Sequence, residues 1–244
     1  MTQAGNGLYG SIKAAVVRVA RLDASCSPIS GATNGAASKA VITLQAQAEQ
    51  ETGDEFNQKN GLGDLLISVK DNDKLKRMNL TLDLATRDFE LIEVMTGATL
   101  ITSGGTTMGI ARRGTSSSAP SPVSVEIWTK VATSSGSCAS TGSGQWFRNV
   151  YPKVVWTLGD SDFGNSIATV KMTGVAEGNP NWGANGPFND WYYTAIPVDT
   201  PETWVLDSVY SSPAEVVASG GVLPVHFFPY TTLFRSRSEE RRVG

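Results

Sequence analysis

Two short segments carry paired carboxylates that could bind a metal ion. Asp71 and Asp73 flank an asparagine, and Asp160 and Asp162 flank a serine. Carboxylate oxygens can bind calcium, but neither segment has the glycine and the distal glutamate of an EF-hand loop. Aspartate also hydrogen-bonds to its own backbone in turns at the ends of hairpins. We therefore favour turn formation at both segments, and we predict neither a metal site nor a cofactor.

The sequence does not predict a catalytic centre. The one histidine, His226, lies in a C-terminal stretch whose composition differs from the rest. No GxSxG elbow, P-loop or GxGxxG loop follows a predicted strand. Glu126 and Glu177 could be acids for glycoside hydrolysis, but nothing in the sequence sets them across a cleft. Cys26 and Cys138 are too few for a structural zinc site, and whether they ever pair stays open. We expect a protein that is not an enzyme.

Aromatic side chains gather in one segment rich in glycine and asparagine. Trp182, Phe188 and Trp191 lie there, next to two tyrosines and among asparagine and aspartate residues. Tryptophan and tyrosine are enriched at protein interfaces, so the cluster could contact another subunit. It could also bind a sugar, or close one end of a β-sheet core. Of the two binding roles, we rank a subunit interface ahead of a sugar site.

The composition is that of a globular protein built from short strands and turns. Of the 244 residues, 40% are hydrophobic and 18% are charged. The net charge of −3 argues against a nucleic-acid-binding surface, but not against a passive conduit for DNA. No run of about 18 apolar residues predicts a membrane helix. The N-terminus lacks a signal-peptide pattern, so we expect the protein to stay in the compartment where it is made.

Apolar residues that alternate with polar ones predict a series of strands. A helix is predicted over about 87–96, capped by Thr86, ended by Gly97 and packed on the sheet. Pro152 predicts a bulge or an edge in its strand. The fold class is therefore mainly β, a β-sandwich or barrel with one flanking helix. The predicted strands are 14–22, 39–49, 64–69, 75–84, 99–102, 106–112, 123–132, 146–158, 165–176 and 203–210.

Two of these strands show the alternation clearly. Strand 39–49 is expected to be half-buried, with Ile42, Leu44, Ala46 and Ala48 on one face and Thr43, Gln45, Gln47 and Glu49 on the other. In strand 123–132, valines and an isoleucine alternate with Ser124, Glu126, Trp128 and Lys130. Each strand is expected to place its two sets of side chains on opposite faces of the sheet.

Three regions are expected along the chain. Residues 1–11 are predicted to be a flexible N-terminal arm, and residues 12–220 a single β domain. Residues 221–244 are predicted to be a non-native tail. The strings HFFPYTTLFRS and RSEERRVG in that tail resemble translated read-through of sequencing adapters. For this reason we assign His226 no role.

Three phrases of the sequence resemble a known family. They are VVRVARLDAS at 16–25, EQETGDEFNQKNGLGDLLISVKDNDKLKRMNLTLDLATRDFELIEVMTGATLIT at 49–102, and NPNWGANGPFNDW at 179–191. They resemble major tail proteins, the tail tube subunits of actinobacterial long-tailed bacteriophages. The resemblance implies a tail-tube fold and hexameric rings that stack into a hollow tube, through which DNA passes at ejection. It also implies contacts with other tail proteins such as the tape measure and terminator, location in the virion tail, and assembly in the host bacterial cytoplasm without a membrane.

By analogy with the tail-tube fold, the acidic segment 49–60 is expected to be an extended hairpin or loop that contacts the neighbouring ring. The candidate subunit-interface residues are Glu49, Glu51, Asp54, Glu55, Phe56, Trp182, Phe188 and Trp191.

Other functions stay open. The protein could be another virion component, such as a tail terminator or a capsid decoration protein. It could also be a carbohydrate-binding β-sandwich that uses the aromatic cluster. A secreted hydrolase is disfavoured, because no histidine lies outside residues 221–244 and no signal-peptide pattern is seen.

Overall fold

The computed structural model describes residues 9–29, 33–114, 120–133, 146–159, 169–181 and 199–207. These ranges contain twelve strands and one helix, which confirms the prediction of a mainly β protein. Residues 1–8 and 221–244 lie outside them, and the first strand begins at Tyr9, inside the predicted N-terminal arm. The elements are β1 (Tyr9–Arg21), β2 (Gly35–Ser38), β3 (Val41–Glu51), β4 (Glu55–Lys59), β5 (Leu65–Lys70), β6 (Lys74–Leu84), α1 (Phe89–Thr96), β7 (Thr99–Ser103), β8 (Thr106–Ala111), β9 (Val123–Thr133), β10 (Trp146–Leu158), β11 (Val170–Glu177) and β12 (Thr203–Asp207).

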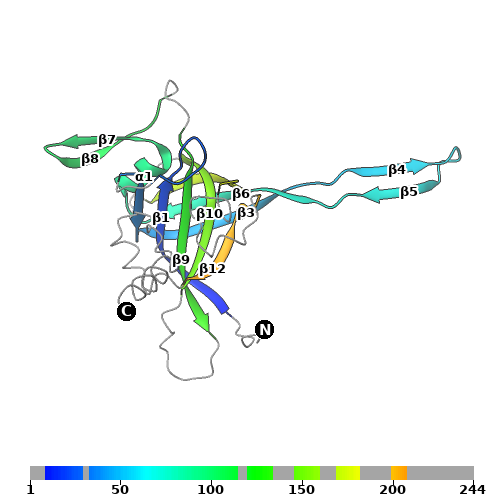
Figure 1. Cartoon of the computed structure of the whole chain (residues 1–244), viewed down its shortest axis with the longest axis horizontal. Coiled ribbons are helices and arrows are strands. Elements are labelled where there is room, and N and C mark those ends of the chain that lie inside the picture. Colours follow the sequence, from blue (N-terminus) through cyan, green and yellow to red (C-terminus); the bar gives the residue numbers. More distant parts are fainter. Residues whose placement is uncertain are drawn as a thin grey trace, which may run out of the picture.

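Eight strands form one antiparallel sheet in the order β2-β1-β9-β10-β11-β6-β3, and β12 pairs with part of β10. In Figure 1, β3 and β6 run across the direction of β1, β9 and β10, so the sheet curls over on itself. Strands β1 and β3 approach each other, yet no ladder joins the two ends of this sheet within the described ranges. The barrel alternative is therefore wrong for these strands, because the sheet stays open.

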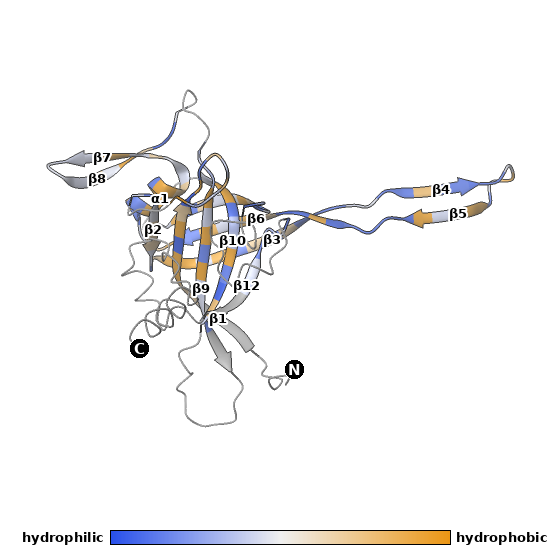
Figure 2. Ribbon diagram, viewed as in Figure 1, coloured by the Kyte–Doolittle hydropathy of each residue, from blue (hydrophilic) through white to orange (hydrophobic). Residues whose placement is uncertain are grey.

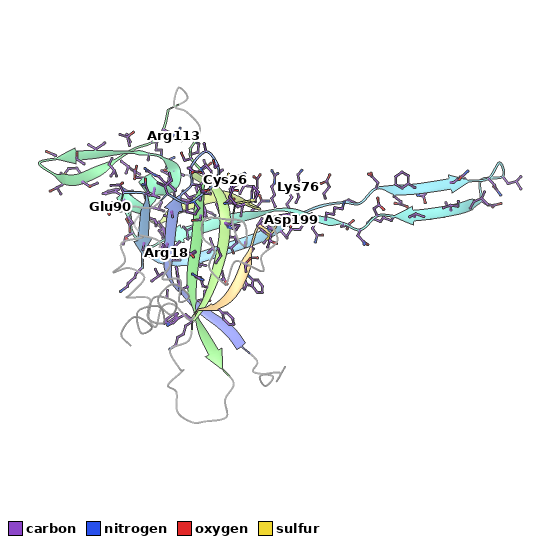
Figure 3. All side chains as sticks on the ribbon, in the orientation of Figure 1. Arg18, Cys26, Lys76, Glu90, Arg113 and Asp199 are labelled. Carbon is purple, nitrogen blue, oxygen red and sulfur yellow. The ribbon has the colours of Figure 1, made fainter. Side chains whose placement is uncertain are left out.

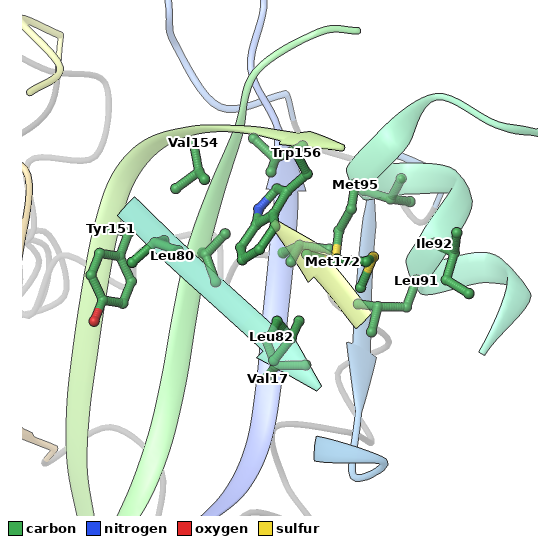
Figure 4. Close-up of a cluster of buried hydrophobic side chains, with 14 of the residues drawn as sticks. Val17, Leu80, Leu82, Leu91, Ile92, Met95, Tyr151, Val154, Trp156 and Met172 are labelled. Carbon is green, nitrogen blue, oxygen red and sulfur yellow. The ribbon is translucent and has the colours of Figure 1, made fainter. Parts of the chain in front are cut away.

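The main core lies inside the curl of the sheet. Leu80 and Leu82 of β6 face Val17 of β1 and Trp156 of β10, and all four are buried (Figure 4). Gly174 of β11 pairs with Trp156 across the ladder, and a Cβ at this glycine would lie 2.7 Å from the indole ring. The glycine thus leaves the space that the large ring fills.

Helix α1 covers one end of this core. Leu91, Ile92 and Met95 are buried (Figure 4). The predicted cap at Thr86 is wrong: the Asp88 carboxylate accepts a hydrogen bond from the Leu91 N–H at 3.1 Å. A cap must directly precede the first helical residue to reach the N–H three positions on, and Thr86 is too far away. Gly97 ends the helix with a φ of +66°, as predicted.

Pro152 lies where β10 changes its partners. The pairing of β10 with β9 shifts register between Tyr151 and Val154. On the other edge, residues 146–150 pair with β12 and residues 153–158 pair with β11. Because proline has no N–H to donate to a ladder, it fits this break, and the predicted bulge is confirmed.

Both faces of β9 are buried. Val125 and Ile127 are buried, but so are Glu126 and Trp128 on the other face. The Glu126 carboxylate accepts a hydrogen bond from Arg18 Nε of β1 at 2.6 Å, and the Arg18 guanidinium lies 5.1 Å from the centre of the Trp128 ring. A buried carboxylate needs such a cation, which explains why a charged residue lies here.

Strand β3 is more exposed than expected. Leu44 is half-buried, but Ile42 is exposed. The register of β3 against β6 shifts between Val41 and Thr43, so Ile42 lies in an irregularity that interrupts the alternation. The prediction of a half-buried strand is therefore wrong at Ile42. It is also wrong at Ala46 and Ala48, which are exposed although they alternate with Leu44.

Candidate subunit interface

A long hairpin, residues 49–77, projects far from the body and is called the hairpin arm below (Figure 1). Its base continues β3 and β6, which stay paired as far as Glu51 and Lys74. Its distal part is the β4–β5 ribbon. At the tip, the Asn60 side chain accepts hydrogen bonds from the N–H groups of Leu62 and Asp64 at 3.0 and 2.8 Å. We expected an extended hairpin or loop over residues 49–60, and a hairpin is what forms.

The distal ribbon has one apolar face. Phe56 pairs with Val69, and Gln58 pairs with Ile67. Because side chains alternate along a strand, Phe56, Ile67 and Val69 lie on the same face. They are 61%, 53% and 53% exposed. Figure 2 shows the apolar colour along β5, within an arm that is otherwise largely hydrophilic.

The opposite face of the ribbon is polar where the strands pair, while Leu66, which is 62% exposed, is the extra residue at the register shift near the tip. Glu55 pairs with Lys70, and Asn57 pairs with Ser68. Asn57 Nδ2 also donates to Glu55 Oε1 at 2.7 Å. An isolated two-stranded ribbon is marginally stable in water, and a contiguous exposed apolar patch marks an interaction site. The arm therefore offers one face for binding and one face for solvent. Figure 3 shows that the side chains of its distal ribbon lie far from those of the body.

A narrow neck, residues 52–54 and 71–73, joins the distal ribbon to the base. The Gly53 N–H donates to Asp73 Oδ1 at 3.0 Å, and the Asp71 N–H donates to the Asp54 carbonyl at 2.9 Å. Hydrogen bonds from Gly53 and then from Lys70 lower the pKa of Asp73. A Cβ at Gly53 would lie 2.1 Å from the Asp71 carbonyl oxygen, so the two strands meet at a distance that only glycine allows.

The neck also bears on the metal interpretation of Asp71 and Asp73. The Asp73 carboxylate accepts a hydrogen bond from the Gly53 N–H and lies 3.3 Å from Lys70 Nζ. It therefore joins the two strands of the neck, instead of bonding to the backbone of its own turn as we had favoured. Within the described ranges, no group of three or more His, Cys, Asp or Glu residues could hold a metal ion. Asp160 and Asp162 lie outside those ranges.

The base of the arm is braced by an ion pair. Arg77 Nε donates to Glu49 Oε2 at 2.6 Å, and Asn79 Nδ2 donates to the same oxygen at 3.2 Å. The hydrogen bond from Arg77, and then that from Asn79, lowers the pKa of Glu49, while Glu49 raises the pKa of Arg77. Glu49 therefore stabilises the base of the arm.

The five described candidates lie on one arm but have different surroundings. Phe56 is on the apolar face, Glu55 is on the polar face, and Glu49 braces the base. Glu51 and Asp54 are exposed near the neck. The other three candidates, Trp182, Phe188 and Trp191, lie outside the described ranges.

Our candidate interface residues did not include the apolar residues opposite Phe56. Ile67 and Val69 belong to the segment 64–69, which it predicted only as a strand. Their alternation could be read from the sequence, as could the turn-forming residues 60–64 that bring this segment back to Phe56. What the sequence could not show is that nothing else in the described part covers this face.

Comparison with known proteins gives no match: no family model fits the chain, and no curated protein is significantly similar to it. In the described ranges, no helix has the length and apolar character needed to cross a membrane.

Proposed function

We propose that this chain is a self-assembling tail tube subunit of a long-tailed bacteriophage, a structural protein and not an enzyme. In this proposal, rings of six copies stack into a hollow tube in the virion tail, after assembly in the host cytoplasm. The tube contacts other tail proteins such as the tape measure and terminator. The exposed apolar face of the hairpin arm carries the proposal, because it is a binding surface that reaches beyond the subunit's own body.

The free energy gained by burying this apolar face is small for one copy, which fits an assembly in which many copies repeat the same contact. Full burial of one large apolar side chain contributes about 1.5–3 kcal/mol. Phe56, Ile67 and Val69 are each about half exposed, so covering what remains contributes roughly 1 kcal/mol per residue. A single arm contact of this size is weak. A ring in which every copy repeats it gains the contact several times at once.

The β3 edge supplies a second surface for self-association. Strand β3 pairs with β6 on one side, and no strand of the described part pairs with its other side. Eleven residues of β3 present this edge, with neither lysine nor proline among them. Lysine and proline are the residues that commonly prevent edge pairing, so this edge can accept a strand from a neighbouring copy.

The outer face of β3, β6, β11 and β10 suits a passage for DNA. Polar residues follow one another across the strands, namely Gln45, Thr81, Thr173 and Thr157. Two cations on this face are paired with carboxylates: Lys153 Nζ lies 3.0 Å from Glu177 Oε2, and Arg77 Nε lies 2.6 Å from Glu49 Oε2. A protein holds nucleic acid by neutralising phosphates with free cations. Since these two cations are already paired, the face would hold passing DNA only weakly.

Self-assembly of the full-length protein tests the proposal. We expect sedimentation velocity to show growth with concentration, and negative-stain electron microscopy to show rings or hollow tubes of uniform width. A protein that stays monomeric at every concentration, and binds glycans on an array, would instead favour the carbohydrate-binding module. Discrete rings that never stack would favour a tail terminator, and binding to capsids without self-assembly would favour a decoration protein.

A further inference from the structure

A second hairpin projects from the body on the side opposite the hairpin arm (Figure 1). It consists of β7 and β8, joined by Gly104 and Gly105 with φ angles of +58° and +80°. Two consecutive positive φ angles are typical of a tight hairpin turn. Its thirteen residues, 99–111, include no charged side chain. The molecule thus has two projecting ribbons at opposite ends.

This β7–β8 hairpin is anchored at its base and exposed beyond it. Ile110 packs against the main core, and both strands lie close to α1. Further out, Ile101 is 52% exposed and Met108 is 65% exposed. Ile101 pairs with Gly109, and no atom lies within 4 Å of the position that a Cβ on this glycine would occupy. Open space therefore lies beside an exposed isoleucine.

We propose that the apolar face of the hairpin arm of one copy packs on the β7–β8 hairpin of the next copy. This inference rests on the self-association proposed above, and it adds which surface the arm meets. Phe56, Ile67 and Val69 would cover Ile101 and reach Met108, which follows Thr107 as the extra residue at the register shift of the β7–β8 ladder.

Charge favours this partner. Gln58, the cross-strand partner of Ile67, is uncharged, and the β7–β8 hairpin has no charged residue, so a contact over these residues would bury no ion without a partner. Glu55 and Lys70, which lie opposite each other on the other face of the arm, would stay in water. Apolar side chains on both sides would lose contact with water together, which is the dominant favourable term in association.

The placement of the two ribbons also favours this partner. A contact between two different surfaces at opposite ends repeats in one direction and builds an open stack. A contact between two arms would be self-complementary, and it would close after two copies. Of the two, only the arm-to-hairpin contact lets layers follow one another without limit.

Complementation between two variants of the full-length chain tests the inference. Variant F56S/I67S replaces two exposed apolar side chains of the arm by serine. Variant I101S/M108S does the same on the β7–β8 hairpin. We expect each variant alone to need at least a tenfold higher concentration than the wild type to stack, as measured by sedimentation velocity. A control on the same hairpin, Thr99→Ser, should stack like the wild type.

The mixture of the two variants is the decisive sample. The intact arms of I101S/M108S can dock on the intact β7–β8 hairpins of F56S/I67S. The arms and hairpins that remain free carry the substitutions, so no further layer can be added. We expect assemblies of limited size that neither variant forms alone. If I101S/M108S stacks like the wild type while F56S/I67S does not, the arm docks elsewhere; the inference fails and the proposed function stands. If the wild type itself never assembles, both fail.

Cross-linking gives a direct second measurement. In a background of Cys26→Ser and Cys138→Ser, one sample carries Ile67→Cys and the other carries Met108→Cys. After mixing, a short bismaleimide should join the two different chains. Cross-links formed only between Ile67→Cys chains would show an arm-to-arm contact and overturn the inference.

Discussion

The neck of the hairpin arm can be disturbed by a single methyl group. In a Gly53→Ala variant, the new Cβ would lie 2.1 Å from the Asp71 carbonyl oxygen and 3.0 Å from that of Asn72. Both are backbone atoms, so no side chain can turn aside to make room. The two strands must separate, and the hydrogen bond from the Gly53 N–H to Asp73 must lengthen.

The size of the displacement follows from the geometry of the ribbon. Moving the contact from 2.1 Å to the 3.4 Å of ordinary van der Waals contact separates the strands by about 1.3 Å. Strands lie about 4.8 Å apart, so this opening tilts the distal ribbon by roughly 15°. The tip lies about 20 Å beyond the neck, at about 3.3 Å per residue, and it would move by about 5 Å. This is enough to take the apolar face away from a fixed partner.

We therefore expect Gly53→Ala to weaken self-assembly at least tenfold in sedimentation velocity, while the melting temperature of the body stays within about 2 °C, since the change is far from the core. Gly61→Ala is the matched control. It lies on the same arm, and no atom is within 4 Å of the position of its Cβ. Assembly of Gly53→Ala at wild-type concentrations would refute the idea that the arm's direction matters.

Three further predictions concern the body and the base of the arm. Gly174→Ala forces a Cβ to within 2.7 Å of the Trp156 ring, and it should destabilise the fold by about 1–3 kcal/mol in urea unfolding. Asp88→Ala removes the helix cap and should cost about 1 kcal/mol in the same assay, whereas Thr86→Ala should change little. The pKa of Glu49 is lowered from 4.5 by its hydrogen bonds. The base is therefore most stable above about pH 4.5, and it should loosen as the pH falls through the lowered pKa, seen as faster hydrogen exchange that the Glu49→Gln variant no longer shows.

Local patterns in the sequence predicted the elements well but not their partners. The strand 75–84 and the bulge at Pro152 follow from alternation and from proline chemistry, and both are present. The pairing of β1 with β9 joins residues about a hundred positions apart, and no local signal specifies it. Glu126 looks solvent-facing by alternation, but it is buried because Arg18 on β1 supplies its cation.

The position of the candidate site was predicted from the sequence, but the chemical type of its contact surface was predicted only in part. The segment 49–60 lies on a projecting hairpin, as expected, and it includes the exposed Phe56. Its acidic residues were predicted to contact another subunit, but the Glu49 carboxylate accepts a hydrogen bond from Arg77 at the base of the arm. The apolar face became visible only when the register placed Ile67 and Val69 beside Phe56. Alternation alone could not show whether that face meets a core or solvent.

The most direct test of the account compares the wild type with F56S/I67S by negative-stain electron microscopy over a range of concentrations. We expect rings stacked into tubes for the wild type, and subunits or unstacked rings for the variant, with the same melting temperature for both. Asn57→Ser, on the polar face of the same ribbon, should form tubes like the wild type. Tubes of equal length and number from F56S/I67S and the wild type would contradict the claim that the hairpin arm builds the assembly.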